Sequence, residues 1–400
     1  MRILLAGDTY PPDVNGAGVL TRRLAEGLAS RRHDVHVMVP SPANFSYEAE
    51  CGGVRLHYLA SHRYPWHPTF HIADFRKLRP AVSDIFQHVI PDVVHVHAHL
   101  AVGRFAAAES RKSNIPWIAT NHFIPENVKH QLPFALLPEF VYARAAALAW
   151  WDLANVFRSA DVITAPTPYA VDVLRTQAGI GHAIPVSCGV DVAAYGQQVG
   201  ERDRTRRTVL FVGRLDTEKH IDEIIDALAL MDHSVCLRVV GPGRQEKYLH
   251  RHAAKRGVDD RVTFVGYLSD DEVRAEYSRA DVFCMPGTAE LQSIATLEAM
   301  ASGLPVVAAA ARALPYLVKP GVNGALFPPG NVRALADALQ YALDEDNAKS
   351  LRDASRLTAQ QHDFKLTLDA FERIYLHTTQ RLNARHRTLH YGLQNRNKED

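Results

Sequence analysis

The sequence predicts an α/β protein with two Rossmann-like, doubly wound domains that face each other across a cleft. Short aliphatic runs alternate with amphipathic helical patterns in the first half of the chain. A polar stretch at 195–207 interrupts this alternation, which then starts again at residue 208. A repeated strand-helix rhythm favours parallel sheets covered by helices. The 400 residues, of which 47% are hydrophobic, suffice for two separate cores.

The first domain is predicted to span residues 1–188. Its first helix follows the pattern "GVLTRRLAEGLASRR", in which Val19, Leu20, Leu24 and Leu28 form one apolar stripe. The predicted strands, which are rich in β-branched and aliphatic residues, lie at 2–7, 34–39, 92–96, 116–119 and 161–164.

Residues 189–207 are predicted to be a linker, and 208–364 the second domain. The segment 365–400 is predicted to be a helix that packs back on the first domain and ends in a basic tail. In the second domain the predicted strands lie at 208–213, 235–241, 261–266 and 281–286. The helices between and after them are predicted at 220–231, 244–257, 269–280 and 293–303.

Bulk composition excludes several classes of protein. The 45 basic and 44 acidic residues nearly cancel, which argues against nucleic acid as a partner. The four cysteines form no C-x-x-C pair, and the first apolar run is too short for a signal peptide, so a cytoplasmic protein is expected. The most apolar long stretch, 132–157, is interrupted by Pro138 and carries charges, so no bilayer-spanning helix is expected.

The strongest motif is "MPGTAELQSIATLEAMASGLPVVA" at 285–308. Its strand leads into a loop that carries Glu290, and a helix then contains Glu298. Ser293 is predicted to cap this helix, whose free N–H groups suit a phosphate. The candidate donor-binding residues of this segment are Leu291, Gln292, Ser293, Ile294 and Glu298. Two ordinary acids on a helix surface are the alternative interpretation.

A second motif is "FVGRLDTEKHIDEIIDAL", in which a buried strand leads to Gly213, Arg214 and Lys219. Two cations at the carboxyl end of a strand can neutralise a diphosphate, because the Arg fork and the Lys point charge both suit phosphate oxygens. Solvated surface cations are the alternative.

A third motif places Gly16 and Gly18 just before the first helix, where glycine lets the backbone approach a ligand. A dinucleotide fingerprint is excluded because Thr21 occupies the third glycine position and the second strand lacks the ribose-binding acid that should follow it.

The "E-x7-E" spacing from Glu290 to Glu298, its "LEAMASGLPVV" continuation and the "G-R-L-x-x-x-K" string closely resemble family-4 retaining glycosyltransferases, which have the GT-B fold. This resemblance implies that Glu290 contacts the donor hexose and Glu298 the ribose hydroxyls. It also implies that Arg214 and Lys219 stabilise the leaving diphosphate, and that the loop of Gly16 and Gly18 lies near the donor phosphates and the acceptor.

Histidines follow two strands of the first half. The resemblance places His122 of "TNHFIPEN" near the reacting centre, although a lone histidine is more often structural. His95, His97 and His99 alternate along one strand; without a carboxylate partner they predict a polar lining of the cleft and no metal site. The only Asp-x-Asp string, at 344–346, follows a helix. No metal and no cofactor other than the nucleotide-sugar co-substrate is therefore expected.

The expected partners are a nucleotide-sugar donor and a hydroxyl acceptor. Cys188, Tyr316 and the "TNHFIPEN" string look like a glycolipid-forming branch such as the diacylglycerol glucosyltransferases, which would make the acceptor a membrane lipid. Peripheral docking on an anionic membrane would use the tryptophans of "AWW" (149–151) and seven basic residues, Arg22, Arg23, Arg31, Arg32, Arg76, Lys77 and Arg79. Solvated helix faces and core tryptophans are the alternative.

Two other functions remain open from the sequence. A non-catalytic nucleotide-sugar-binding protein would bind a donor without releasing nucleotide, and a glycosyl phosphorylase of similar fold would need a pyridoxal-phosphate lysine. No residue distinguishes UDP-glucose, UDP-galactose and GDP-mannose as the donor.

Overall fold

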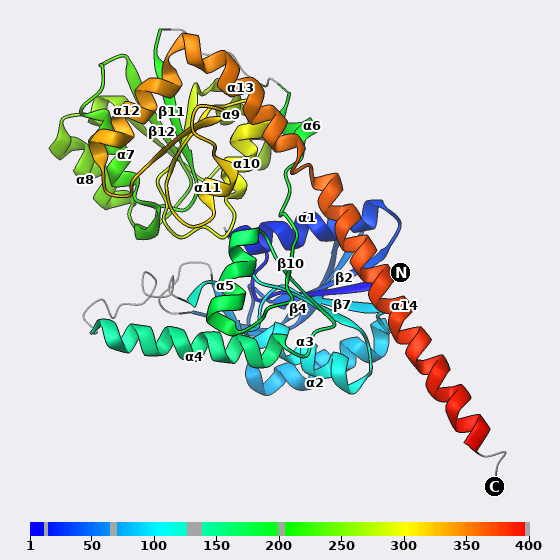
Figure 1. Cartoon of the computed structure of the whole chain (residues 1–400). Coiled ribbons are helices and arrows are strands. Elements are labelled where there is room, and N and C mark those ends of the chain that lie inside the picture. Colours follow the sequence, from blue (N-terminus) through cyan, green and yellow to red (C-terminus); the bar gives the residue numbers. More distant parts are fainter. Residues whose placement is uncertain (12–14, 65–69, 126–137, 198, 200–204, 397–400) are drawn as a thin grey trace. The chain divides into compact units, whose positions relative to one another are not determined.

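The protein is described by a computed structural model (Figure 1). The structure describes all residues except 12–14, 65–69, 126–137, 198, 200–204 and 397–400, with side chains as far as residue 381. The chain forms two compact units. The first unit comprises Met1–Val186 and Leu368–Asp400, and the second comprises Ser187–Thr367. The segment 189–207, predicted as a linker, is grouped with the second unit, and the chain returns to the first unit within its last helix.

The first unit contains an eight-stranded sheet in the order β10-β9-β8-β7-β1-β2-β4-β3 among the described residues. β3 runs antiparallel to β4, and the other neighbouring strands are parallel. The strands are β1 (Arg2–Ala6), β2 (Asp34–Pro40), β3 (Tyr47–Cys51), β4 (Val54–Leu59), β7 (Val93–Val96), β8 (Trp117–Thr120), β9 (Val162–Ala165) and β10 (Ile184–Pro185), and a separate pair is β5 (Ser61–Arg63) with β6 (His71–Ala73).

The helices of the first unit begin where the sequence supplies caps. Asn15 accepts a hydrogen bond from the backbone of Gly18 at the start of α1, and Thr167 does the same for Ala170 in α5. Gly179 ends α5 with a left-handed φ of 63°. The helices are α1 (Gly16–Ser30), α2 (Phe75–Val89), α3 (Ala101–Lys112), α4 (Glu139–Phe157), α5 (Pro168–Ala178) and α14 (Phe364–Arg396).

The second unit contains a six-stranded, all-parallel sheet in the order β13-β12-β11-β14-β15-β16 among the described residues. Its strands are β11 (Arg207–Val212), β12 (Val235–Val240), β13 (Val262–Gly266), β14 (Val282–Met285), β15 (Val306–Ala309) and β16 (Gly324–Phe327). Its helices are α6 (Val192–Tyr195), η2 (Thr217–Lys219), α7 (Ile221–Leu228), α8 (Glu246–Arg256), η3 (Asp259–Arg261), α9 (Asp270–Arg279), α10 (Ile294–Ala301), α11 (Leu314–Leu317), α12 (Val332–Leu343) and α13 (Glu345–Gln360).

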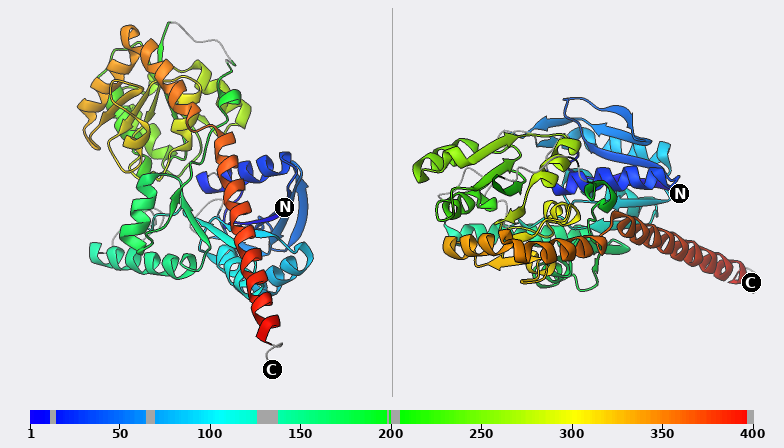
Figure 2. Two further views of the ribbon diagram at one scale, coloured as in Figure 1. Left: turned by 45° about the vertical axis from the view of Figure 1, so that its right-hand side comes forward. Right: turned by 90° about the horizontal axis from the view of Figure 1, so that it is seen from above.

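Each unit has helices on both faces of its sheet (Figures 1 and 2). The central strands are therefore buried on both sides, which explains their continuous aliphatic sequences. Phe211 and Phe283 of the second unit have no solvent exposure, and the same holds for Leu4 and Val94 of the first. The prediction of two Rossmann-like α/β domains is confirmed.

In both sheets the chain adds strands first on one side of the first strand and then on the other, so the strand order reverses there. In the second unit the connections run outward from β11 to β12 and β13, and then from β14 to β15 and β16. In the first unit the equivalent neighbours are β1 and β7. Ligands of doubly wound sheets bind outside the carboxyl ends of the strands at this reversal, so these two positions are where functional side chains are expected.

Candidate functional site

The loop after β11 begins with two close backbone contacts. Gly213 has a φ of 156°, and its N–H donates to Val240. A Cβ on Gly241, where φ is 122°, would lie 2.1 Å from the carbonyl oxygen of Gly213. Only glycine at 241 allows the loops after β11 and β12 to approach this closely.

Arg214 is held by two buried carboxylates of its own loop. Its guanidinium donates to Asp216 at 2.8 Å and to Glu218 at 3.3 Å, and those two acidic side chains are only 6% and 4% exposed. Asp216 also lies 3.6 Å from the guanidinium of Arg244. The Arg214 side chain itself is 24% exposed, so its fork is fixed from the inside while one side remains accessible.

Lys219 ends the short helix η2 and forms an ion pair with Glu290, which lies in the loop after β14. Both side chains are more than four-fifths buried. The two loops are also joined through the backbone, because Thr288 donates to the carbonyl of Glu218 at 3.2 Å. The structure therefore brings together Arg214, Lys219 and Glu290 where β11 adjoins β14.

The segment after Glu290 is fixed by side-chain hydrogen bonds. Ser293 caps α10, as predicted, by accepting a hydrogen bond from the backbone of Thr296. Gln292 accepts from the backbone of Cys188 at 2.7 Å and donates to Ser187 at 3.0 Å, so both ends of its amide hold the start of the second unit. Leu291 is buried, and Ile294 is the first residue of α10.

Glu298 lies inside α10 and is 7% exposed. Its carboxylate accepts a hydrogen bond of 3.1 Å from the hydroxyl of Tyr277, a fully buried residue of α9. This bond fixes the rotamer of Glu298 from the core side.

In the first unit, the predicted glycines lie at the start of α1. Gly16 is the first residue of the helix, and a Cβ on Gly18 would lie 3.3 Å from the Cα of Tyr10. The preceding residues of this loop, 12–14, lie outside the described part of the chain.

His122 lies just after β8 and stacks on His97, with 5.5 Å between ring centroids and 3.3 Å between the nearest nitrogens. His97 follows β7, the neighbour of β1 at the sheet reversal. Burial lowers the pKa of His122 to about 4, so this half-buried imidazole is neutral at physiological pH.

The other two histidines of the alternating run are buried as well. His95 has no exposure and hydrogen-bonds to Tyr375 of α14 and Thr120 of β8, and His99 is 2% exposed. The predicted polar lining is instead an internal network of the first unit. Over the described residues, no group of three or more histidine, cysteine, aspartate or glutamate side chains is arranged to hold a metal ion.

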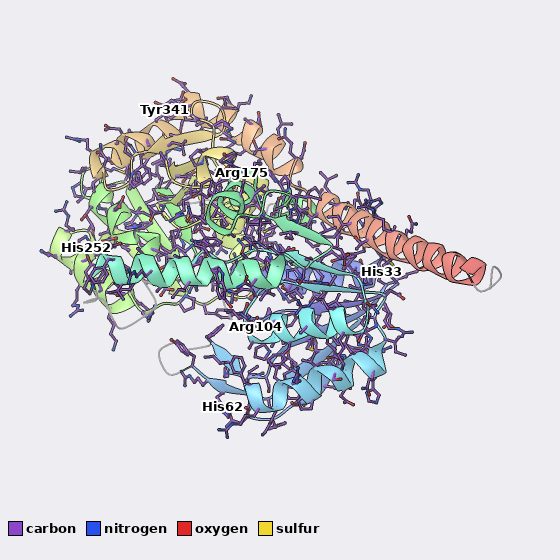
Figure 3. All side chains as sticks on the ribbon, turned by 60° about the horizontal axis from the view of Figure 1, so that its bottom comes forward. His33, His62, Arg104, Arg175, His252 and Tyr341 are labelled. Atoms are coloured by element: carbon purple, nitrogen blue, oxygen red, sulfur yellow. The ribbon has the colours of Figure 1, made fainter. Side chains whose placement is uncertain are left out.

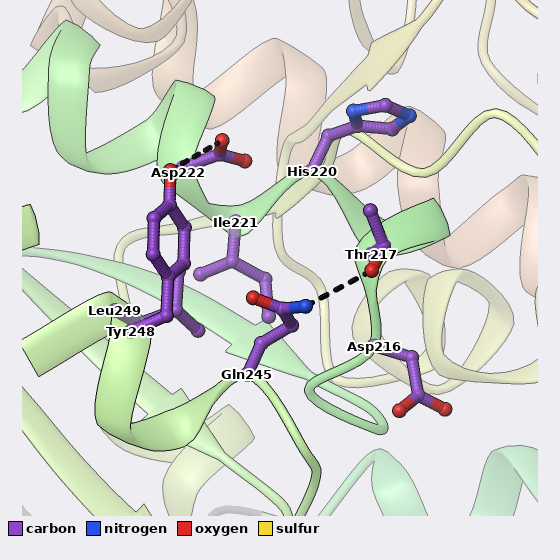
Figure 4. A pocket seen from close by; sticks show the side chains of 8 residues that line it. All are labelled: Asp216, Thr217, His220, Ile221, Asp222, Gln245, Tyr248 and Leu249. Atoms are coloured by element: carbon purple, nitrogen blue, oxygen red, sulfur yellow. Dashed lines mark hydrogen bonds between the residues drawn. The ribbon is translucent and has the colours of Figure 1, made fainter. Parts of the chain in front are cut away.

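A hollow of about 160 Å³ lies beside the loop after β11 (Figure 4). Gln245 donates to Thr217 across it at 3.0 Å, and the Tyr248 hydroxyl lies 3.5 Å from Asp222. None of the predicted site residues lines this hollow, whose walls are Asp216, Thr217, His220, Ile221, Asp222, Gln245, Tyr248 and Leu249.

The sequence interpretation missed Asp216, Glu218 and Tyr277, the buried side chains that hold Arg214 and Glu298. It also missed Asp8 after β1, which accepts hydrogen bonds from the first turn of α3 and whose pKa burial raises to about 6. Asp216 and Glu218 both lie between the two cations in "RLDTEK", and this pattern was the available signal.

The two tryptophans of "AWW" have different environments. Trp150 is 2% exposed and belongs to the core, whereas Trp151 is 64% exposed. Of the basic residues, Arg31 forms ion pairs with Asp369 and Glu372 of α14. No helix in the described part of the chain has the length and apolar character that crossing a membrane requires.

Known proteins resemble the chain over most of its length. A GDP-mannose-dependent alpha-mannosyltransferase of Corynebacterium glutamicum is 27% identical over 360 residues, covering 86% of this chain and 81% of that protein. An alpha-monoglucosyldiacylglycerol synthase of Acholeplasma laidlawii is 23% identical over 350 residues, covering 82% and 85%. Among solved structures, a sucrose-phosphate synthase from Thermosynechococcus elongatus superposes with a TM-score of 0.75 at 22% identity, covering 94% and 99%.

Two family models match successive parts of the chain. Residues 14–194 match the model described as Glycosyltransferase Family 4, and residues 197–361 match the one described as Glycosyl transferases group 1. The chain therefore belongs to the family-4 glycosyltransferases of GT-B fold, which transfer sugars from nucleotide-sugar donors.

Proposed function

We propose that this protein transfers a hexose from a nucleotide-diphosphate sugar to a hydroxyl group of a membrane lipid, with retention of the anomeric configuration. The observation that carries the proposal is the cluster of Arg214, Lys219 and Glu290 where β11 adjoins β14. A fixed Arg fork and a Lys ammonium together suit the oxygens of a diphosphate.

The proposed reaction is a front-face displacement. The bond between the anomeric carbon and the diphosphate oxygen breaks, and the acceptor oxygen bonds to the anomeric carbon on that same face. The acceptor proton passes to an oxygen of the departing phosphate. Arg214 and Lys219 stabilise the negative charge that grows on the diphosphate, and donors fixed before the reaction are the most effective means of doing so.

Glu290 is proposed to orient the hexose, and Glu298 to accept from the ribose hydroxyls. In the structure Lys219 is neutralised by Glu290, so a bound diphosphate would compete with Glu290 for the ammonium. That exchange leaves the Glu290 carboxylate available to sugar hydroxyls. His122, held neutral by burial, is proposed to contact the hexose as a hydrogen-bonding group and not as a charge.

Support for the lipid acceptor comes from the relatives and from the surface of the first unit. The Acholeplasma laidlawii relative is named for a glycolipid product, and α4 exposes large apolar side chains. Support for the donor class comes from the Corynebacterium glutamicum relative, which is named for its dependence on GDP-mannose.

The direct test is a panel of donors, UDP-glucose, UDP-galactose and GDP-mannose, each assayed for protection against thermal unfolding and for nucleotide release with diacylglycerol in detergent. A donor at about 100 times its Kd adds roughly 2.7 kcal/mol to the free energy of unfolding. One donor should raise the Tm and release its nucleotide only when the acceptor is present. Protection without release, whatever the acceptor, would identify a nucleotide-sugar-binding protein instead.

The Asp216→Asn variant tests how Arg214 is positioned. The amide side chain would keep the shape of the aspartate but lose the charged partner of the guanidinium, so the fork is expected to shift. We expect kcat/KM to fall by about 10²-fold, a loss that a displacement near 1 Å at a reacting centre can cause. The measurement is steady-state kinetics with the donor that the panel identifies.

Asp222→Asn is the matched control, because Asp222 contacts Tyr248 and not Arg214. Asp216→Glu restores the charge. If it also restores activity, the loss in Asp216→Asn results from the position of Arg214 and not from a general loss of folding. Unchanged kcat/KM in Asp216→Asn would show that Glu218 alone holds the fork.

A further inference from the structure

The loop that joins β14 to α10 carries Glu290 and has no regular secondary structure over residues 286–293. Its conformation therefore depends on contacts with other loops. One of these contacts is the ion pair between Glu290 and Lys219. A diphosphate that binds the Lys219 ammonium would remove this contact, so other contacts must hold Glu290 in place during the reaction.

Thr288, two residues before Glu290, is hydrogen-bonded through all its polar groups. Its backbone N–H donates to the carbonyl of Glu218 at 3.2 Å, and its own carbonyl accepts from Nε of Arg312 at 2.9 Å. Its hydroxyl forms a hydrogen bond of 3.1 Å with Nε2 of His220. Thr288 is therefore held by the loops that follow β11 and β15, the two strands that flank β14 in the sheet.

His220 and Arg312 share an uncommon backbone conformation. Each has a φ of 49°, in the left-handed region that residues with a Cβ rarely adopt. Among the described residues of the second unit, no other non-glycine residue has a positive φ. Both side chains nevertheless bond to the same threonine. Backbone strain of this kind persists only where the surrounding structure maintains it, and it is concentrated at functional sites.

The left-handed residues of the first unit have an ordinary explanation. Ile90 ends α2, and Arg32 and Asn114 lie two residues after the last residues of α1 and α3. A left-handed residue commonly closes a helix in this way. Arg312 instead lies between β15 and α11, so no helix end accounts for its conformation.

The loop of Arg312 also contacts Glu290 directly. The N–H of Ala313 donates to the carbonyl of Glu290 at 3.4 Å. The bond from Arg312 to Thr288 comes from a charged donor on a half-buried side chain, and charged donors form stronger hydrogen bonds than neutral ones. None of these bonds involves the Glu290 carboxylate, so all of them can remain when that carboxylate leaves Lys219.

We propose that Arg312 and His220, here named the Thr288 clamp, are positioning residues that hold Glu290 at the sugar while the diphosphate occupies Lys219. The inference rests on the proposed function, because it explains how Glu290 stays in place after its ion pair is broken. Both residues act through Thr288 and not by contact with the donor. Relief of the strain at Arg312 should therefore lower activity without lowering stability.

The test is steady-state kinetics and thermal unfolding of Arg312→Gly, with the donor that the panel identifies. Glycine adopts the left-handed backbone without strain but has no side chain to hold Thr288. The Tm should stay within about 3 °C of the wild type, because relief of strain offsets the lost hydrogen bond. We expect kcat to fall by about 10- to 10²-fold while KM for the donor stays within about threefold, since the loss concerns orientation and not donor binding.

Three further variants separate the side chain from the backbone. Arg312→Asn tolerates the left-handed conformation, but its amide nitrogen lies one atom closer to the backbone than Nε and carries no charge, so it should lose most of the same activity. Arg312→Lys keeps a charged donor and should recover kcat to within about fivefold of the wild type. Thr288→Val removes only the bond with His220 and should lower kcat by about threefold.

Arg32→Gly is the matched control. Arg32 has a φ of 66° and is exposed in the turn between α1 and β2 of the first unit. Figure 3 shows the next residue, His33, beside α14, where it lies 2.8 Å from Glu372. The same substitution relieves the same kind of strain at this position, so Arg32→Gly should keep its Tm within about 3 °C and its kcat within about twofold.

A double-mutant cycle tests whether Arg312 acts through Glu290. In a Glu290→Ala background, Arg312→Gly should cost less than about twofold in kcat, because no carboxylate remains to be positioned. Losses that multiply in the double variant would show that Arg312 acts on another group and would overturn the inference. So would an Arg312→Gly enzyme with kcat within about threefold of the wild type, the result expected of an arginine that only closes a turn.

The same measurements separate this inference from the proposed function. If Glu290→Ala lowers kcat while Arg312→Gly does not, only the Thr288 clamp is refuted. If Glu290→Ala has the kcat of the wild type, the proposed role of Glu290 is refuted whatever the Arg312 variants show.

Discussion

Lys219→Met is expected to lower kcat by about 10³-fold at saturating donor, because it removes a fixed positive charge from the developing diphosphate. Methionine keeps the unbranched stem, so the packing of η2 is preserved. Glu290→Gln should also lower kcat, by about 10²-fold, because the amide can still hydrogen-bond to the sugar but without charge. Both values are to be measured as initial rates of nucleotide release.

The effects of the two substitutions should not add. Lys219 and Glu290 contact each other in the structure, so each single variant also changes the partner that remains. The double variant should therefore be less impaired than the product of the single losses. This result would distinguish one joint site from two independent ones.

Arg207→Met provides the control at the other end of the same strand. Arg207 begins β11 and pairs with Glu345, whereas Lys219 follows the carboxyl end of β11. Loss of the Arg207 pair should leave kcat within about twofold, since exposed ion pairs contribute little. A Lys219→Met enzyme with kcat within about tenfold of the wild type would remove Lys219 from the proposed chemistry, and an increase in KM alone would limit it to ground-state binding.

The sequence predicted where strands and helices lie along the chain better than which of them pack against one another. Continuous aliphatic runs identified β1, β2, β11 and β12, because strands buried on both faces carry little else. β3 and β4 were missed. Four of the five residues of β3 are exposed, and the strand includes Glu48 and Glu50, which give no apolar signal.

The contact between Lys219 and Glu290 could not come from periodicity. It depends on β14 pairing with β11, although two strands separate them in the chain, and only the family resemblance indicated that the two loops meet. The roles of Asp216 and Glu218 were missed although both residues lie in the same loop as Arg214. An acidic residue in a loop is usually solvated, and the burial of these two results from tertiary packing.

The adjacent tryptophans show how far a helical pattern can be interpreted. Neighbouring residues of a helix point about 100° apart, so Trp150 faces the core while Trp151 faces solvent. The sequence alone left membrane docking and core packing as alternatives for both. Similarly, His95 bonds to Tyr375, a residue 280 positions away, and no local pattern predicts such a contact.

Acid is expected to unfold the first unit before the second. Burial lowers the pKa of four neighbouring histidines of the first unit: that of His95 to about 3, those of His99 and His122 to about 4, and that of His97 well below its usual value. A histidine with a depressed pKa stabilises the fold fully above pH 6.5, and this contribution is lost as the pH falls toward the folded pKa. For His99 alone the loss by pH 4 is about 3 kcal/mol.

Asp8 acts in the opposite direction. Burial raises its pKa to about 6, so its contribution to stability is fully present below pH 3.8 and is lost as the pH rises through 6. On acidification the contribution of Asp8 to the free energy of unfolding therefore rises by about 3 kcal/mol. This gain offsets roughly the loss from one of the four histidines. The remaining losses are comparable with the 5 to 15 kcal/mol that stabilises a typical domain, so unfolding is expected near pH 5.

Tryptophan emission can follow the first unit separately, because all four tryptophans of the chain belong to it, at 66, 117, 150 and 151. Emission should shift to the red near pH 5, while far-ultraviolet circular dichroism keeps the contribution of the second unit to lower pH. His99→Phe should move the midpoint to lower pH. The phenyl ring can pack against Phe123 and Phe157 as the imidazole does, but it has no group that takes up a proton. His182→Gln, at an exposed position, should leave it unchanged. Coincident unfolding of both units below pH 4 would show that the buried histidines do not govern acid stability.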